Sequence, residues 1–218
     1  MATRNLCAVA PAPRTPAEDV DGLPEGGAAA ARAAVERLFP GRYAPVDGPH
    51  GDVCVWVGTY GETVLVVGDA VGAGEARVPE GWGVYRYGFQ TVALAASFEV
   101  EVAGRRRLVA LSPESVDHEE GASLPFEAAF RGAVGVVDAD GLCVAAQQWM
   151  FGARADAPDP AAWAGPVAPH AFRPAGAVAG AGGSGTEAAV PARNGNQPGR
   201  AGRPGRFSRF RRRLGYGS

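Results

Sequence analysis

Residues 91–130 constrain the fold more than any other stretch of this chain. Where the first strand of this stretch ends, apolar side chains alternate with Glu99 and Glu101, and this period of two is typical of a half-buried strand. A short Ala-Gly turn follows, and a second apolar run extends to Leu111. The sequence therefore predicts an antiparallel hairpin, which is followed by a polar connector over residues 112–130.

The other elements of the first 151 residues fit the same kind of body. Two β-branched runs, residues 52–59 and 63–69, are joined by a Tyr-Gly turn and predict a second hairpin. Residues 11–27 contain four prolines and are expected to form a loop. Further strands are expected over residues 5–10 and 82–90, and helices over residues 28–39 and 142–151.

Together these patterns predict an α+β fold for residues 1–151. We expect about six mainly antiparallel strands with two helices packed on the sheet. Residues 152–205 are rich in Ala, Pro and Gly and have no periodic apolar face, so we expect a disordered linker there. Residues 206–218 form a separate Arg-rich tail.

The formal charge is divided unevenly along the chain. Residues 1–192 carry a formal charge of −10, whereas residues 193–218 contain eight arginines and no acidic residue. Such an asymmetry is typical of an interaction arm. The candidate partner-binding residues are Arg206, Phe207, Arg209, Phe210, Arg211, Arg212 and Arg213. Interleaved Arg and Phe suit a nucleic acid, an anionic membrane surface or an acidic protein, and a merely solubilising tail is the alternative.

The connector contains the residues that an enzyme at this position would use. Ser112 is a possible nucleophile and His118 a possible base, and Glu127 is the third candidate of such a site. However, the G-x-S-x-G motif is absent, so a Ser-Pro turn that ends the strand is an alternative role for Ser112. Glu127 could instead cap a helix by accepting backbone N–H bonds.

Neither a cofactor nor a metal is predicted. The glycines of residues 180–185 match G-x-G-x-x-G but lie inside the expected linker, without the strand and helix that the motif requires. His118-Glu119-Glu120 lacks the second histidine of a zinc-protease motif. The three cysteines, Cys7, Cys54 and Cys143, lie far apart in apolar runs and are expected to be buried thiols.

The sequence also bears on where the protein is located. Its longest apolar runs are shorter than the ~20 residues that a transmembrane helix needs. The apolar run near the N-terminus ends at Pro11 and is too short for the core of a signal peptide. We therefore expect a reduced, cytoplasmic protein.

Two motifs resemble those of an uncharacterised actinobacterial family of unknown function. The first is L-S-P-E-S followed by L-P-F-E-A-A-F-R-G, and the second is R-L-F-P-G at residues 37–41. This chain differs from the family pattern at Glu114, where Asp is usual, at Ala129, where Pro is usual, and at Arg131, where Trp is usual. The resemblance covers residues 4–151 and implies a shared architecture in a bacterial cytoplasmic protein. It implies no catalytic residues, because the family has no established activity.

The sequence thus favours a non-enzymatic interaction domain whose basic C-terminal tail contacts an anionic partner. The alternative is a small hydrolase-like enzyme with a cleft at the connector, using Ser112, His118 and Glu127. The sequence does not predict the oligomeric state.

Overall fold

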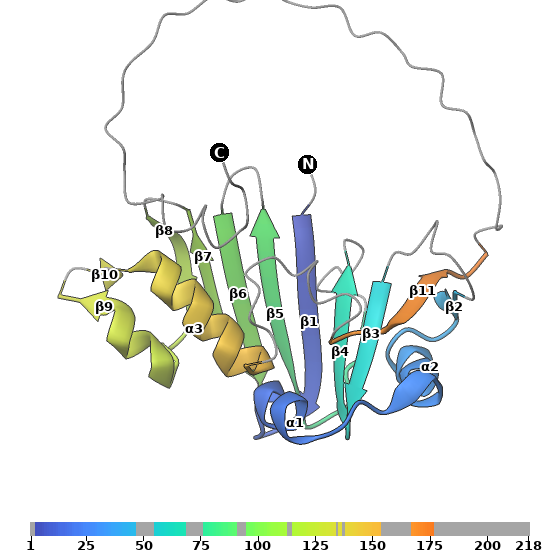
Figure 1. The fold of residues 1–218 in the computed structure, drawn as a ribbon. Helices are drawn as coiled ribbons and strands as arrows, with labels where there is room; N and C mark the ends of the chain where they lie inside the picture. The colour runs from blue at the N-terminus through green and yellow to red at the C-terminus, as the bar shows by residue number, and fades with distance from the viewer. Residues whose placement is uncertain are drawn as a thin grey trace, which may run out of the picture. The chain divides into compact units, whose positions relative to one another are not determined.

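A computed structural model gives the fold of the chain (Figure 1). It describes residues 3–46, 55–68, 76–90, 95–112, 115–133, 135–136, 138–153 and 167–176. Residues 1–175 form one compact unit. In its described part, this unit is an α+β body built on a nine-stranded antiparallel sheet.

The order of the strands across the sheet differs from their order along the chain. It runs β2-β11-β3-β4-β1-β5-β6-β7-β8, so β2 and β8 are the edge strands. These strands are β1 (Thr3–Pro11), β2 (Tyr43–Pro45), β3 (Val55–Tyr60), β4 (Thr63–Gly68), β5 (Trp82–Gln90), β6 (Ala95–Val102), β7 (Arg105–Leu111), β8 (Val116–Glu120) and β11 (His170–Pro174). A separate two-stranded sheet pairs β9 (Arg131–Gly132) with β10 (Gly135–Val136).

Helices lie on both faces of the sheet. They are α1 (Pro16–Gly22), α2 (Gly27–Leu38), the 3₁₀ helix η1 (Pro125–Phe130) and α3 (Ala139–Phe151). Val84 and Tyr85 are consecutive in β5, so their side chains point to opposite faces. Val84 belongs to the apolar cluster under α2, whereas the Tyr85 ring lies 6.1 Å from the ring of Trp149 in α3. Figure 1 accordingly shows α3 across β6 and β7, and α2 beside β3 and β2.

Both predicted hairpins are confirmed. β3 pairs with β4, and β6 pairs with β7. The β6–β7 turn has positive φ at both central residues, 50° at Ala103 and 74° at Gly104, as the turns that match strand twist require. The two predicted helices correspond to α2 and α3, and α3 begins where the Asp138 side chain accepts the Gly141 N–H at 3.0 Å.

The number of strands exceeds the prediction of about six. The connector contains a strand, β8, although its sequence, VDHEE, has no apolar alternation. Charged residues are tolerated there because β8 is an edge strand with one neighbour. Residues 11–27, predicted as a loop, contain α1, in which Pro16 takes the first helical position after Thr15.

The predicted end of the folded body at residue 151 is wrong. β11 lies between β2 and β3, and Phe172 is 2% exposed and Val167 3% exposed. These few apolar residues have no periodic pattern, and insertion into the sheet is what buries them. The remainder of the predicted linker, residues 177–205, and the tail lie outside the described residues, as do residues 154–166.

None of the described helices is both long enough and apolar enough to cross a membrane.

Candidate functional site

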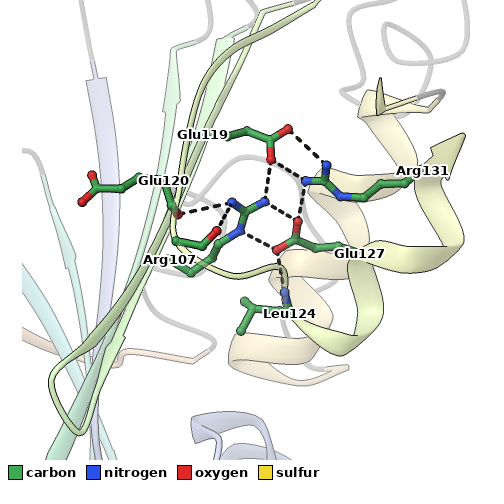
Figure 2. Close-up of polar contacts among 7 residues, drawn as sticks. Arg107, Glu119, Glu120, Leu124, Glu127 and Arg131 are labelled. Carbon is green, nitrogen blue, oxygen red and sulfur yellow. Dashed lines mark hydrogen bonds and ion pairs between the residues drawn. The ribbon is translucent and has the colours of Figure 1, made fainter. Parts of the chain in front are cut away.

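Arg107 is the centre of a charge network between the sheet and η1 (Figure 2). Its Nε donates to Glu127 Oε1 at 2.8 Å, and its Nη2 donates to Glu127 Oε2 and, at 2.9 Å, to Glu119 Oε2. Its Nη1 donates to the backbone oxygens of Glu120 and Gly121, at 3.2 and 3.1 Å. All five N–H groups of this guanidinium therefore have acceptors, although its side chain is 4% exposed.

The sheet and η1 bring these groups together. Arg107 shares the inward face of β7 with Val109 and Leu111, both buried. Glu119 of β8 is paired with Val109, so its side chain lies on the same face. Pro125 starts η1 with its fixed φ, and this turn places Glu127 so that its Oε1 accepts the Leu124 N–H at 2.9 Å.

Arg131 provides the second guanidinium of the network. Its Nη1 donates to Glu119 Oε1 at 3.2 Å, and its Nη2 donates to Glu119 Oε2 and to Glu127 Oε2, both at 2.7 Å. Its Nε is buried and has no hydrogen-bond acceptor within the described part of the chain. The two arginines and two glutamates cancel in charge, and this cancellation is what allows Glu127 to be 0% exposed.

The network holds both carboxylates ionised. Burial alone would raise the pKa of Glu127, but hydrogen bonds from Arg107, the Leu124 N–H and Arg131 outweigh it and lower the pKa. Hydrogen bonding to Arg131, together with Arg107, lowers the pKa of Glu119 against the smaller opposing effect of burial. Neither carboxylate is therefore suited to exchanging protons near neutral pH.

Ser112, His118 and Glu127 do not converge on one site. His118 is paired with Ala110, whereas the next residue, Glu119, is paired with Val109 on the face that holds Glu127. Successive side chains of a strand alternate, so His118 points to the opposite face of the sheet from Glu127. The Ser112 hydroxyl lies 2.9 Å from Ser115 Oγ and 3.0 Å from Asp117 Oδ1, in a turn at the end of β7.

These positions distinguish the catalytic role from the structural role considered for Glu127 and for Ser112. Glu127 accepts a backbone N–H at the start of η1, so the predicted structural role of Glu127 is confirmed. Both oxygens of the Glu127 carboxylate also accept hydrogen bonds from Arg107, so Glu127 is not free to orient His118. The Ser112 contacts fit the alternative of a strand-ending turn.

Sequence reasoning missed Arg107, Glu119 and Arg131. One signal was present, because Arg107 occupies an inward position in the alternation of β7, two residues before Val109. A buried arginine requires a carboxylate partner, so this position could have prompted a search for one. The sequence does not identify that partner, because Glu127 lies twenty residues further along the chain.

A second set of charges lies on the opposite face of the sheet. Arg86 Nη1 donates to Glu99 Oε2 at 3.0 Å, and Arg106 connects Glu99 to Glu120 through its Nε and Nη1. The Arg106 and Glu120 side chains are 45% and 49% exposed. The exposed Arg106–Glu120 pair contributes little to stability, whereas the Arg86 and Glu99 side chains are 18% and 13% exposed.

Glu25 forms a smaller polar cluster near the start of α2. Its Oε1 accepts the Thr59 N–H at 3.1 Å, and its Oε2 accepts the Gly27 N–H at 2.8 Å and lies 3.2 Å from His170 Nε2. Burial tends to raise the pKa of Glu25, but the two backbone hydrogen bonds and His170 together lower it. The cluster connects the loop before α2 to β3 and β11.

The two described cysteines, Cys7 and Cys143, are poorly suited to act as nucleophiles. Burial raises the pKa of Cys7 to about 11 and that of Cys143 to about 12, so both are protonated and unreactive at neutral pH. Both are free buried thiols, as predicted, and Cys54 lies outside the described residues. Within the described residues, no group of three or more His, Cys, Asp or Glu side chains could hold a metal ion.

The network predicts a loss of stability in acid. The pKa values of Glu119 and Glu127 are lowered by folding, so their contribution is complete above the unfolded-state value of about 4.5 and is lost as pH falls through the folded-state values. Glu119→Gln removes one of these groups. Urea unfolding from pH 7 down to about pH 3 should show a shallower pH dependence for this variant than for wild type. Equal slopes would contradict a role for Glu119 in acid sensitivity.

Searches against protein-family models, curated proteins and solved structures found no match to this chain.

Proposed function

We propose that this chain is a non-enzymatic interaction protein whose Arg-rich tail binds an anionic partner. The observation that carries the proposal is the separation of charge, with eight arginines and no acidic residue in residues 193–218. Phe207 and Phe210 lie among the last of these arginines, Tyr216 follows them, and all three could stack on bases. The proposal includes a cytoplasmic location and kinship with the actinobacterial family.

The structure of the connector favours an interaction protein over an enzyme. Its most deeply buried carboxylate, Glu127, is bound to two arginines and a backbone N–H. His118 lies on the opposite face of the sheet, so the catalytic alternative lacks the acid that would orient its base. The connector therefore serves to attach η1 to the edge of the sheet.

Removing charge from the tail should weaken binding to nucleic acid. We expect the full chain to bind a labelled RNA or DNA at low salt, and replacement of Arg206, Arg209, Arg211, Arg212 and Arg213 by Gln to weaken it strongly. For duplex DNA the slope of log K against log salt should become less negative by about 4.5 if all five arginines contact phosphates, because each phosphate contact contributes about 0.9. Fluorescence anisotropy over a salt series measures both quantities.

A second variant separates charge from stacking, and a second probe separates nucleic acid from membrane. Replacing Phe207 and Phe210 with Ser retains every charge and should weaken single-stranded RNA binding with little change in salt slope. Anionic vesicles give the membrane arm of the same assay. Binding that survives the five Gln substitutions, or no binding of the full chain to any of these probes at low salt, would contradict the proposal.

A further inference from the structure

Glu119 is held in the way that proteins hold the carboxylate of a ligand. Two guanidinium groups converge on it, with Arg131 donating to both carboxylate oxygens at 3.2 and 2.7 Å and Arg107 donating to Oε2 at 2.9 Å. Paired N–H donors facing paired oxygens are the usual geometry for recognition of carboxylate and phosphate groups. Figure 2 shows both arginines directed at this one side chain.

Arg107 does not depend on Glu119 for its position, and Arg131 keeps one other hydrogen bond that holds it near the site. Glu127 binds Arg107 through two N–H groups and Arg131 through one, and the backbone oxygens of Glu120 and Gly121 hold the Nη1 of Arg107. Without Glu119, Arg107 would keep four of its five hydrogen bonds, and Arg131 would remain attached to Glu127 through its Nη2. The remaining charges, two arginines and Glu127, would leave one net positive charge for an anion.

Glu119 is also the more easily displaced of the two carboxylates. Its side chain is 31% exposed, whereas that of Glu127 is 0% exposed. It lies on β8, an edge strand of five residues whose register with β7 shifts between Ala110 and Leu111. Short edge strands belong to the less stable parts of a fold, so moving Glu119 outward costs less than moving Glu127.

We propose that Arg107 and Arg131 form an oxyanion-binding site that Glu119 fills in the resting protein, and that a carboxylate or phosphate group of a ligand replaces the Glu119 carboxylate there. Both groups present two oxygens to the same N–H donors. Glu119 competes with the ligand, so the apparent affinity of the wild-type protein is reduced by the fraction of time that the site is occupied by Glu119. This site is independent of the tail.

Removing the competing side chain tests the proposal in the full chain. Calorimetric titration with sodium phosphate and with sodium acetate, at pH 7 and at an ionic strength fixed with sodium chloride, gives an affinity for each probe. We expect Glu119→Ala to bind at least one of them about tenfold or more tightly than wild type, because the site is then always free. The stronger of the two probes identifies the ligand group as phosphate or carboxylate.

Three further variants make the result specific. Glu120→Ala removes a neighbouring carboxylate that points to the other face and should bind like wild type. Glu119→Ala with Arg131→Gln removes one guanidinium and should lose the gain. Glu119→Gln retains the shape of the side chain and gives a second test if the alanine variant folds poorly by circular dichroism. Folded Glu119 variants that bind neither probe more tightly than wild type, or an equal gain in Glu120→Ala, would overturn the proposal.

Discussion

Replacing Glu127 with alanine is expected to lower the free energy of unfolding by about 3–5 kcal/mol, the usual cost of removing one member of a buried ion pair. Glu127 accepts two hydrogen bonds from Arg107, whose side chain is 4% exposed and has no access to bulk water as a substitute. The Leu124 N–H that starts η1 would lose its acceptor as well. Urea unfolding at pH 7, followed by circular dichroism, measures the loss.

Two control variants identify the cause of this loss. Glu120→Ala removes an exposed carboxylate from β8 and should cost less than about 1 kcal/mol, as expected for a surface ion pair. Arg107→Met combined with Glu127→Leu removes both buried charges and should cost less than Glu127→Ala alone, because no charge is left unpaired. If Glu127→Ala were no more destabilising than Glu120→Ala, the network would not be a main support of the connector.

The sequence predicted those strands and helices in which the pattern of apolar and polar residues matches the pattern of buried and exposed side chains. The β3–β4 pair is almost wholly buried and β-branched, and β6 alternates between the two faces, so local pattern and tertiary position agree. α2 was predicted for the same reason, since its buried residues recur at helical spacing. Local sequence is sufficient to predict a strand or helix that carries its own stripe of apolar residues.

The missed elements depend on partners that are distant in the chain. β8 has no apolar pattern and forms because it pairs with β7 at the edge of the sheet. β11 comes late in an Ala- and Pro-rich region and is a strand only because β2 and β3 flank it. The charge network follows the same rule, because only the role of Glu127 at the start of η1 is local, whereas its contact with Arg107 requires the folded sheet.

Shortening the chain tests the corrected end of the folded body. A variant that ends at Ala153 lacks β11 and should lose most of its stability or fail to fold, whereas one that ends at Gly176 should unfold at the same urea concentration as the full chain. Without β11, β3 has an unpaired edge and β2 has no partner strand. Tyr60 would also lose the Val167 oxygen to which its hydroxyl donates at 2.9 Å.

A single substitution separates the packing of β11 from the effect of chain length. Phe172 is 2% exposed and belongs to the apolar cluster under α2, so Phe172→Ala in the full chain should cost about 3–5 kcal/mol. That is a large part of the roughly 5–15 kcal/mol that stabilises an ordinary domain, and loss of the whole strand must cost more. A chain ending at Ala153 that unfolds cooperatively at the same urea concentration as the chain ending at Gly176 would show that the body is complete without β11.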